Sequence, residues 1–149
     1  MDKTTLERAA GRTALRLPEE LRARIESWAE AGYPSETCGL LLGWEIGPRI
    51  AVVEVARARN QERARPDDRY ELDPDDLLAA DLRARALGLE IVGIWHSHPD
   101  HPARPSTTDR ARAWDGWSYV IVSVDGHGAQ ELRSWRMSAG DFVEEEVSP

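Results

Sequence analysis

The sequence predicts a single α/β domain with a mixed central β-sheet flanked by about three helices. Stretches with the patterns of strands and of helices alternate along the 149 residues. One stretch, Leu89–Trp95, is a compact apolar run typical of strands that are buried on both faces. The length also suits one domain with a hydrophobic core of its own.

The individual elements follow from apolar spacing and from the residues that start and stop helices. Pro18 and two glutamates begin the first helix and Gly32 ends it, whereas Asp73 is the expected N-cap of the second, with Pro74 at its first position. In the first half of the chain we expect a strand at Ala14–Leu17, a helix from Pro18 to about Ala31, and a hairpin of Cys38–Trp44 and Arg49–Ala58. A short strand at Tyr70–Leu72, a helix from Asp73 to near Gly88 and the strand Leu89–Trp95 follow. The last elements are a short helix from Ser106 through Trp114 and a hairpin of Tyr119–Val124 and Glu131–Met137.

Two polar segments are expected to lie outside this framework. Residues 1–12 lack apolar periodicity, so they predict a flexible N-terminal arm in front of a domain that spans residues 13–149. Residues 59–68 are charged and nearly free of apolar side chains, which predicts an exposed, mobile loop.

Composition excludes several classes of function. The net charge of −8 argues against binding to the backbone of a nucleic acid, which requires a clustered excess of basic residues. A single cysteine, Cys38, excludes an intramolecular disulfide and a cysteine-rich zinc module. The chain shows neither a basic-then-apolar leader nor an apolar run of roughly 20 residues, so we expect a cytoplasmic protein that does not insert into membranes.

The end of the apolar strand carries a candidate metal site. Residues two apart in a strand point to the same face, so His96 and His98 can present their imidazoles side by side before Pro99 ends the strand. Asp109 follows a proline-rich loop that can turn the chain back toward them. Two imidazoles and one carboxylate form a three-ligand zinc site with one open position.

Each part of this pattern also has an ordinary structural explanation. An isolated His-x-His pair is more often a surface pair than a metal site. Ser106 and Asp109 have the spacing of a capping box, in which a serine starts a helix and an acidic residue bonds back to it. The combination of the apolar strand, the His-Ser-His-Pro corner and Ser-x-x-Asp favours the metal site.

The segment from His96 to Asp109 resembles the JAMM motif of the MPN-plus metalloproteases. That motif is His-Ser/Thr-His-Pro, six residues, Ser, two residues and Asp, and this chain matches all of it. Pro34-Ser35-Glu36-Thr37-Cys38-Gly39, the apolar Leu40–Gly43 and Tyr70-Glu71-Leu72-Asp73-Pro74 resemble the compact prokaryotic branch of the family.

The resemblance implies a role for each matching residue. His96, His98 and Asp109 would bind one Zn²⁺ per chain, and Glu36 would be the general acid and base without touching the metal. Ser106 would donate a hydrogen bond to the developing oxyanion. The implied fold is one MPN domain with a layout similar to that of cytidine deaminases.

The same resemblance implies the substrate. Prokaryotic relatives cleave the amide or isopeptide bond after the C-terminal Gly-Gly of ubiquitin-like β-grasp sulfur carriers, and the leaving amine belongs to cysteine, lysine or another group. The loop of residues 59–68 is a candidate for clamping that tail. The alternatives are a metallopeptidase that acts on unrelated peptides and a non-catalytic MPN scaffold, although scaffolds typically lack the ligands that are present here. The sequence leaves open whether the protein is a homodimer.

The remaining reactive or aromatic residues are expected to be structural. Cys38 should pack as a small buried residue, and His101 and His127 should be exposed to solvent. Trp28 has core spacing, and Trp114 and Trp117 either pack in the core or line the substrate groove.

Overall fold

The computed structural model describes residues 12–149 except 63–64 and 68. Apart from Arg12, the predicted N-terminal arm therefore lies outside the described residues. The described elements are β1 (Ala14–Arg16), α2 (Glu19–Gly32), β2 (Cys38–Ile46), β3 (Arg49–Ala58), α3 (Pro74–Ala86), β4 (Glu90–Pro99), α4 (Thr107–Arg112), β5 (Ser118–Asp125), β6 (Gly128–Ser138) and β7 (Asp141–Ser148).

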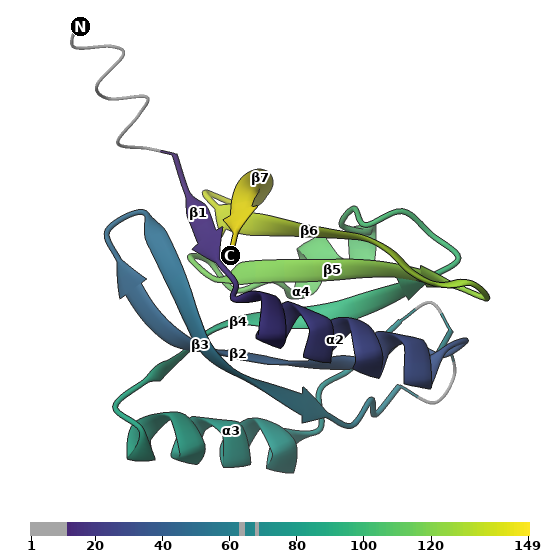
Figure 1. Ribbon diagram of the computed structural model, residues 1–149, viewed down its shortest axis with the longest axis horizontal. Coiled ribbons are helices and arrows are strands. Elements are labelled where there is room, and N and C mark those ends of the chain that lie inside the picture. The colour runs from purple at the N-terminus through teal and green to yellow at the C-terminus, as the bar shows by residue number, and fades with distance from the viewer. Residues whose placement is uncertain (1–11, 63–64, 68) are drawn as a thin grey trace, which may run out of the picture.

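The strands form one mixed sheet that closes into a barrel in the order β1-β3-β2-β4-β5-β6-β7. Strand β1 closes it, because it pairs in parallel with both β3 and β7. Figure 1 shows α2 crossing one side of the strands and α3 lying apart from it beside β2 and β3. The predicted α/β fold with a mixed sheet and about three helices is confirmed.

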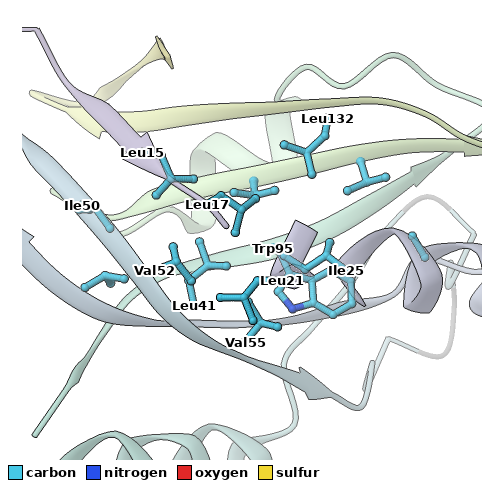
Figure 2. Close-up of a cluster of buried hydrophobic side chains, with 14 residues drawn as sticks. Leu15, Leu17, Leu21, Ile25, Leu41, Ile50, Val52, Val55, Trp95 and Leu132 are labelled. Atoms are coloured by element: carbon cyan, nitrogen blue, oxygen red, sulfur yellow. The ribbon is translucent and has the colours of Figure 1, made fainter. Parts of the chain in front are cut away.

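Helix α2 covers the first of two apolar clusters. Leu21, Ile25 and Ala29 recur at intervals of one helical turn, and all three are buried against the strands. Trp95 of β4 lies in the same cluster and stacks on Trp28 with ring centroids 5.6 Å apart. Figure 2 shows this cluster between α2 and the barrel strands.

The opposite face of β4 borders the second cluster. Ile94 packs there with Ala80 and Ala84 of α3, and Tyr70 lies in the same cluster. Since side chains alternate along a strand, Ile94 shares its face with His96 and His98, whereas Trp95 points into the first cluster. The two clusters thus support β4 from both faces and fix which way the histidines point.

Several predicted boundaries need correction. Strand β4 begins at Glu90 and ends at Pro99, as expected for the strand that carries the two histidines, so the apolar run Leu89–Trp95 covers only its first part. Helix α4 ends at Arg112 because Ala113 has extended backbone (ψ 142°), so it does not reach Trp114. The predicted strand at Tyr70–Leu72 is only a single bridge between Asn60 and Leu72. Strand β7 was not predicted, and none of the described helices is both long and apolar enough to cross a membrane.

A buried ion pair lies where the barrel closes. Arg136 Nη2 on β6 is 2.8 Å from Glu145 Oε2 on β7, and both side chains are almost fully buried. Ser118 and Ser134 donate to the other oxygen of Glu145 at 2.6 and 2.8 Å. Arg136 also donates to the Ala14 carbonyl of β1, at 3.4 Å. One network therefore joins β1, β5, β6 and β7.

Breaking this pair should destabilise the barrel. We expect Arg136→Met to lower the free energy of unfolding by about 3–5 kcal/mol, because Glu145 would stay buried without its cation. Arg133 on the same strand is a matched control: it pairs with Glu144 at the surface, and Arg133→Met should cost less than about 1 kcal/mol. Urea unfolding measures both, and equal costs would contradict a role of the network in barrel closure.

Candidate active site

The two histidines of the motif converge at the carboxyl end of β4. Their Nε2 atoms are 3.1 Å apart. His96 is fully buried, and His98 is 8% exposed. Two imidazoles on one strand face thus share one small volume under the surface.

Asp109 reaches the same point from the first turn of α4. Ser106 is the N-cap of this helix, and its hydroxyl accepts from the Asp109 N–H at 3.0 Å. In return, the Ser106 N–H donates to Asp109 Oδ2 at 2.8 Å. This oxygen lies 3.3 Å from His96 Nε2 and 3.2 Å from His98 Nε2. The capping box and the convergence with the histidines are therefore one arrangement.

The spacing of these three atoms fits a tetrahedral zinc ion. For ligand bonds near 2.0–2.1 Å, neighbouring corners of a tetrahedron are about 3.3 Å apart. The three observed separations are 3.1, 3.3 and 3.2 Å. Nitrogen and carboxylate oxygen are donors that zinc accepts. The residues present thus fit a zinc ion with a fourth position left over.

Neighbouring groups orient both imidazoles. His98 Nδ1 lies 2.8 Å from the Pro102 carbonyl. Because a carbonyl only accepts, Nδ1 carries a proton, and in the neutral ring Nε2 then offers a lone pair. Tyr70 stacks on the His96 ring with centroids 4.5 Å apart. His96 Nδ1 is buried and has no hydrogen-bond partner among the described residues.

The electrostatics favour a carboxylate beside a neutral imidazole. Burial lowers the pKa of His96 below its ordinary value. Burial alone would raise the pKa of Asp109, but its interactions with His96 and His98 and the hydrogen bond from the Ser106 N–H hold it well below its usual range. Burial also opposes the charged form of His98, yet its bond to Asp109 and the charge of that carboxylate raise its pKa.

Glu36 lies beside the histidines, just before β2. The side chain is only 4% exposed, and one donor atom each of Glu36, His96 and His98 fall within 4.8 Å of one another. The geometry therefore allows two sets of three donors, the histidines with Asp109 or with Glu36. The separations of Asp109 from the two imidazoles, 3.3 and 3.2 Å, match the edges of a zinc tetrahedron, which favours the first set.

The backbone around Glu36 is held on both sides. Its N–H donates to the Pro66 carbonyl at 2.7 Å, and its carbonyl accepts from the Asn60 side chain at 3.1 Å. The following residue, Thr37, donates from its N–H to the hydroxyl of Ser97, which lies between the two histidines, at 2.8 Å. Ser97 thus links the segment of Glu36 directly to the strand of the candidate ligands.

Asn60 is a site residue that the sequence did not indicate. Its amide nitrogen donates to the carbonyls of Glu36 and Arg69, both at 3.1 Å. Its amide oxygen accepts from the N–H groups of Glu62 and Glu71, both at 2.9 Å. All four hydrogen-bonding positions of the amide are used. The loop that was predicted to be exposed and mobile is therefore anchored at Asn60, which is partly buried.

Two hollows meet at Glu36. One, of about 400 Å³, is lined by Glu36, His98 and Ser106 among others. A second, of about 820 Å³, shares Glu36 and is also lined by Thr37 and Asn60. Glu36 therefore forms part of the wall of both hollows, although its side chain is almost fully buried.

The other residues considered from the sequence lie in several environments. Cys38 is fully buried, and burial raises the pKa of its thiol to about 12, so it is not an activated nucleophile. His101 and His127 are exposed as predicted, although His101 lines the smaller hollow. Trp117 packs against the second core cluster, whereas the Trp114 side chain is 64% exposed.

Several known proteins with similar sequences are named as desampylases or peptidases. The chain is 37% identical over 117 residues to a desampylase of Haloferax volcanii, covering 75% of this chain and 82% of that protein. It is 35% identical over 122 residues to the CysO-cysteine peptidase of Mycobacterium tuberculosis, with 80% of each covered. A probable TtuB-protein conjugate cleaving protease of Thermus thermophilus is 36% identical over 110 residues, covering 74% of this chain and 68% of that protein.

Solved structures support the same fold. A solution structure of a Desulfitobacterium hafniense protein superposes with a TM-score of 0.78 at 30% identity, covering 89% of this chain and 90% of the other. The crystal structure of a JAB1/MPN domain protein from Archaeoglobus fulgidus has a TM-score of 0.54 at 19% identity, covering 91% and 97%, which shows a shared fold.

The comparisons confirm the resemblance that the sequence motif indicated and the predicted class of JAB-type peptidase. Residues 18–138 match the family described as prokaryotic homologs of the JAB domain. This match includes Glu36 and the whole segment from His96 to Asp109. The chain belongs to the prokaryotic JAB family.

Proposed function

We propose that this chain is a zinc-dependent peptidase that cleaves the amide or isopeptide bond after the C-terminal Gly-Gly of a ubiquitin-like β-grasp sulfur carrier. The observation that carries the proposal is the spacing of His96, His98 and Asp109 at the edges of a zinc tetrahedron, with Glu36 beside them. The names of the relatives, a desampylase and peptidases of CysO and TtuB conjugates, support the substrate class. The reaction would take place in the cytoplasm.

Under this proposal, His96, His98 and Asp109 hold the metal. When bound, Zn²⁺ supplies a Lewis acid and lowers the pKa of water to about 7. Buried Asp109 is a suitable ligand because the Ser106 N–H fixes the oxygen that faces both imidazoles. The Pro102 carbonyl fixes the tautomer of His98 in the same way.

Glu36 and Ser106 complete the chemistry. The Glu36 carboxylate takes a proton from the attacking water and delivers it to the leaving amine, so that one group acts first as base and then as acid. The Ser106 hydroxyl uses a lone pair for the helix cap, so its proton is free to be donated to the developing oxyanion. The two hollows that meet at Glu36 give room for chain on both sides of the scissile bond.

Zinc binding tests the ligand set. We expect one zinc ion per chain, and His98→Ala or Asp109→Ala should weaken zinc binding by more than about 100-fold, since loss of an outer-shell partner alone typically costs roughly 10- to 100-fold. His101→Ala is the matched control, because His101 lines the same hollow but is exposed. Metal analysis after gel filtration measures the stoichiometry. Unchanged zinc content in both ligand variants would contradict the assignment.

Glu36→Gln tests the general base. The rate constant kcat for release of a ubiquitin-like carrier from an amine adduct should fall by about 10²- to 10⁴-fold, while bound zinc stays at the wild-type level. Mass spectrometry of the released carrier measures the rate, with chelated wild-type enzyme as the metal-free reference. Cleavage that survives chelation would rule out the metal mechanism, and loss of zinc in Glu36→Gln would make Glu36 a ligand instead of the base.

Ser106 has to be tested without destroying the helix cap. Replacing an N-cap serine with glycine lowers stability by only a few tenths of a kcal/mol. Ser106→Gly therefore removes the hydroxyl at little cost and preserves the backbone N–H that donates to Asp109. We expect kcat to fall by about 10²- to 10³-fold with zinc content and unfolding midpoint near the wild-type values. If kcat is unchanged in a zinc-loaded Ser106→Gly variant, the hydroxyl serves only the cap.

A further inference from the structure

The smaller hollow beside the candidate metal site has cationic walls. Besides Glu36, His98 and Ser106, it is lined by Arg65, Arg69 and Arg104, with Asp67 as the other acidic residue. The whole chain has a net charge of −8, so this excess of arginine over acidic side chains is a local feature.

Arg104 extends from a fixed point next to the site. Its N–H donates to the Pro102 carbonyl at 2.8 Å, the same carbonyl that accepts from His98 Nδ1. The preceding residue, Ala103, is fully buried, and its carbonyl accepts from Trp135 Nε1 at 3.0 Å. The backbone of Arg104 is therefore anchored to the ring of a candidate ligand and to the core.

Arg69 reaches the hollow from a different segment. Its carbonyl accepts from the Asn60 side chain at 3.1 Å, and its N–H donates to the Arg65 carbonyl at 2.9 Å. The next residue, Tyr70, is buried and stacks on His96. Two arginines from separate, anchored loops thus border the hollow that His98 and Ser106 also line.

Neither of these two guanidinium groups donates a hydrogen bond or forms an ion pair within the described part of the chain. There, no carboxylate or carbonyl accepts a hydrogen bond from the side chain of Arg69 or Arg104. Other arginines are paired, as Arg59 is with Asp76 at 3.1 Å and Arg83 with Glu54 at 3.3 Å. A guanidinium carries a fork of N–H donors that matches the two oxygens of a carboxylate. Arg69 and Arg104 can therefore bind a carboxylate group of a substrate.

Resting on the proposed function, we propose that Arg69 and Arg104 bind the α-carboxylate of a leaving amino acid. If the scissile nitrogen is the α-amine of a free amino acid, the carbon next to it also carries a carboxylate. The hollow lined by His98 and Ser106 borders the proposed reaction centre, so it can receive that charge. The side-chain amine of a lysine within a protein has no charged group so close. The substrate class is therefore a carrier joined to a single amino acid, in preference to a carrier joined to a protein lysine.

The test compares three adducts of one ubiquitin-like carrier ending in Gly-Gly. In the first adduct, the terminal carboxyl of the carrier is joined to the α-amine of alanine, whose own carboxylate is free. In the second it is joined to alaninamide, and in the third to the side-chain amine of a lysine in a capped peptide. We expect wild-type kcat/KM to be about 10- to 100-fold higher for the first adduct, the range that a charge-assisted hydrogen bond supplies. Arg104→Gln and Arg69→Gln should reduce this preference by acting on the first adduct alone.

The controls separate the two proposals. Arg110→Gln on α4 changes an arginine that pairs with Asp141 outside the hollow, and it should leave all three rates unchanged. Equal losses on all adducts in Arg104→Gln would show that the arginines bind carboxylates of the carrier and would overturn the inference, as would no loss at all. Inhibition by free alanine but not by alaninamide is a second measurement. If the zinc-loaded wild type cleaves no adduct, the proposed function itself fails.

Discussion

The buried carboxylate of Asp109 is the interaction on which the rest of the site depends. A carboxylate that is only 6% exposed is costly unless hydrogen bonds and opposite charge compensate it. The Ser106 N–H and the two imidazoles provide that compensation on one oxygen. The compensation works only if α4 starts at Ser106 and β4 ends with both imidazoles on one face. The position of a short helix and the end of a strand are thus determined by the same charge.

A second set of contacts keeps Glu36 in register with this centre. The hydroxyl of Ser97 accepts from Thr37, and the hydroxyl of Tyr33 donates to Asp100 at 2.9 Å, so the segment from residue 33 to 37 is tied to both sides of the His98-Pro99 corner. Asn60 adds the loop after β3 to the same assembly. Because these bonds run through side chains and backbone of three separate segments, the position of the proposed base does not depend on one loop alone.

The sequence could predict what depends on local spacing and could not predict what depends on the paths of loops. The i, i+2 spacing of His96 and His98 and the capping box at Ser106 depend on a few neighbouring residues, and the structure has both. The four bonds of Asn60 join residues that are as many as 24 positions apart, and a polar residue in a charged segment gives no signal of them. Strand β7 was missed because Glu145 points inward where alternation calls for an apolar residue. The ion pair with Arg136 and the hydroxyls of Ser118 and Ser134 make that burial tolerable.

The arrangement separates the residues that keep the fold from those that choose a substrate. The first apolar cluster lies between α2 and the strands, and the Arg136–Glu145 network lies at barrel closure, whereas the candidate chemistry gathers where β4 ends. Arg69 and Arg104 are on loops whose backbones are anchored, but their side chains make no contribution to the metal donors. Their replacement should therefore change the charge of the hollow and leave Asp109 and the histidines in place. Under the two proposals, a change of these loop arginines would alter the preferred leaving amine, and the three candidate metal ligands would stay the same.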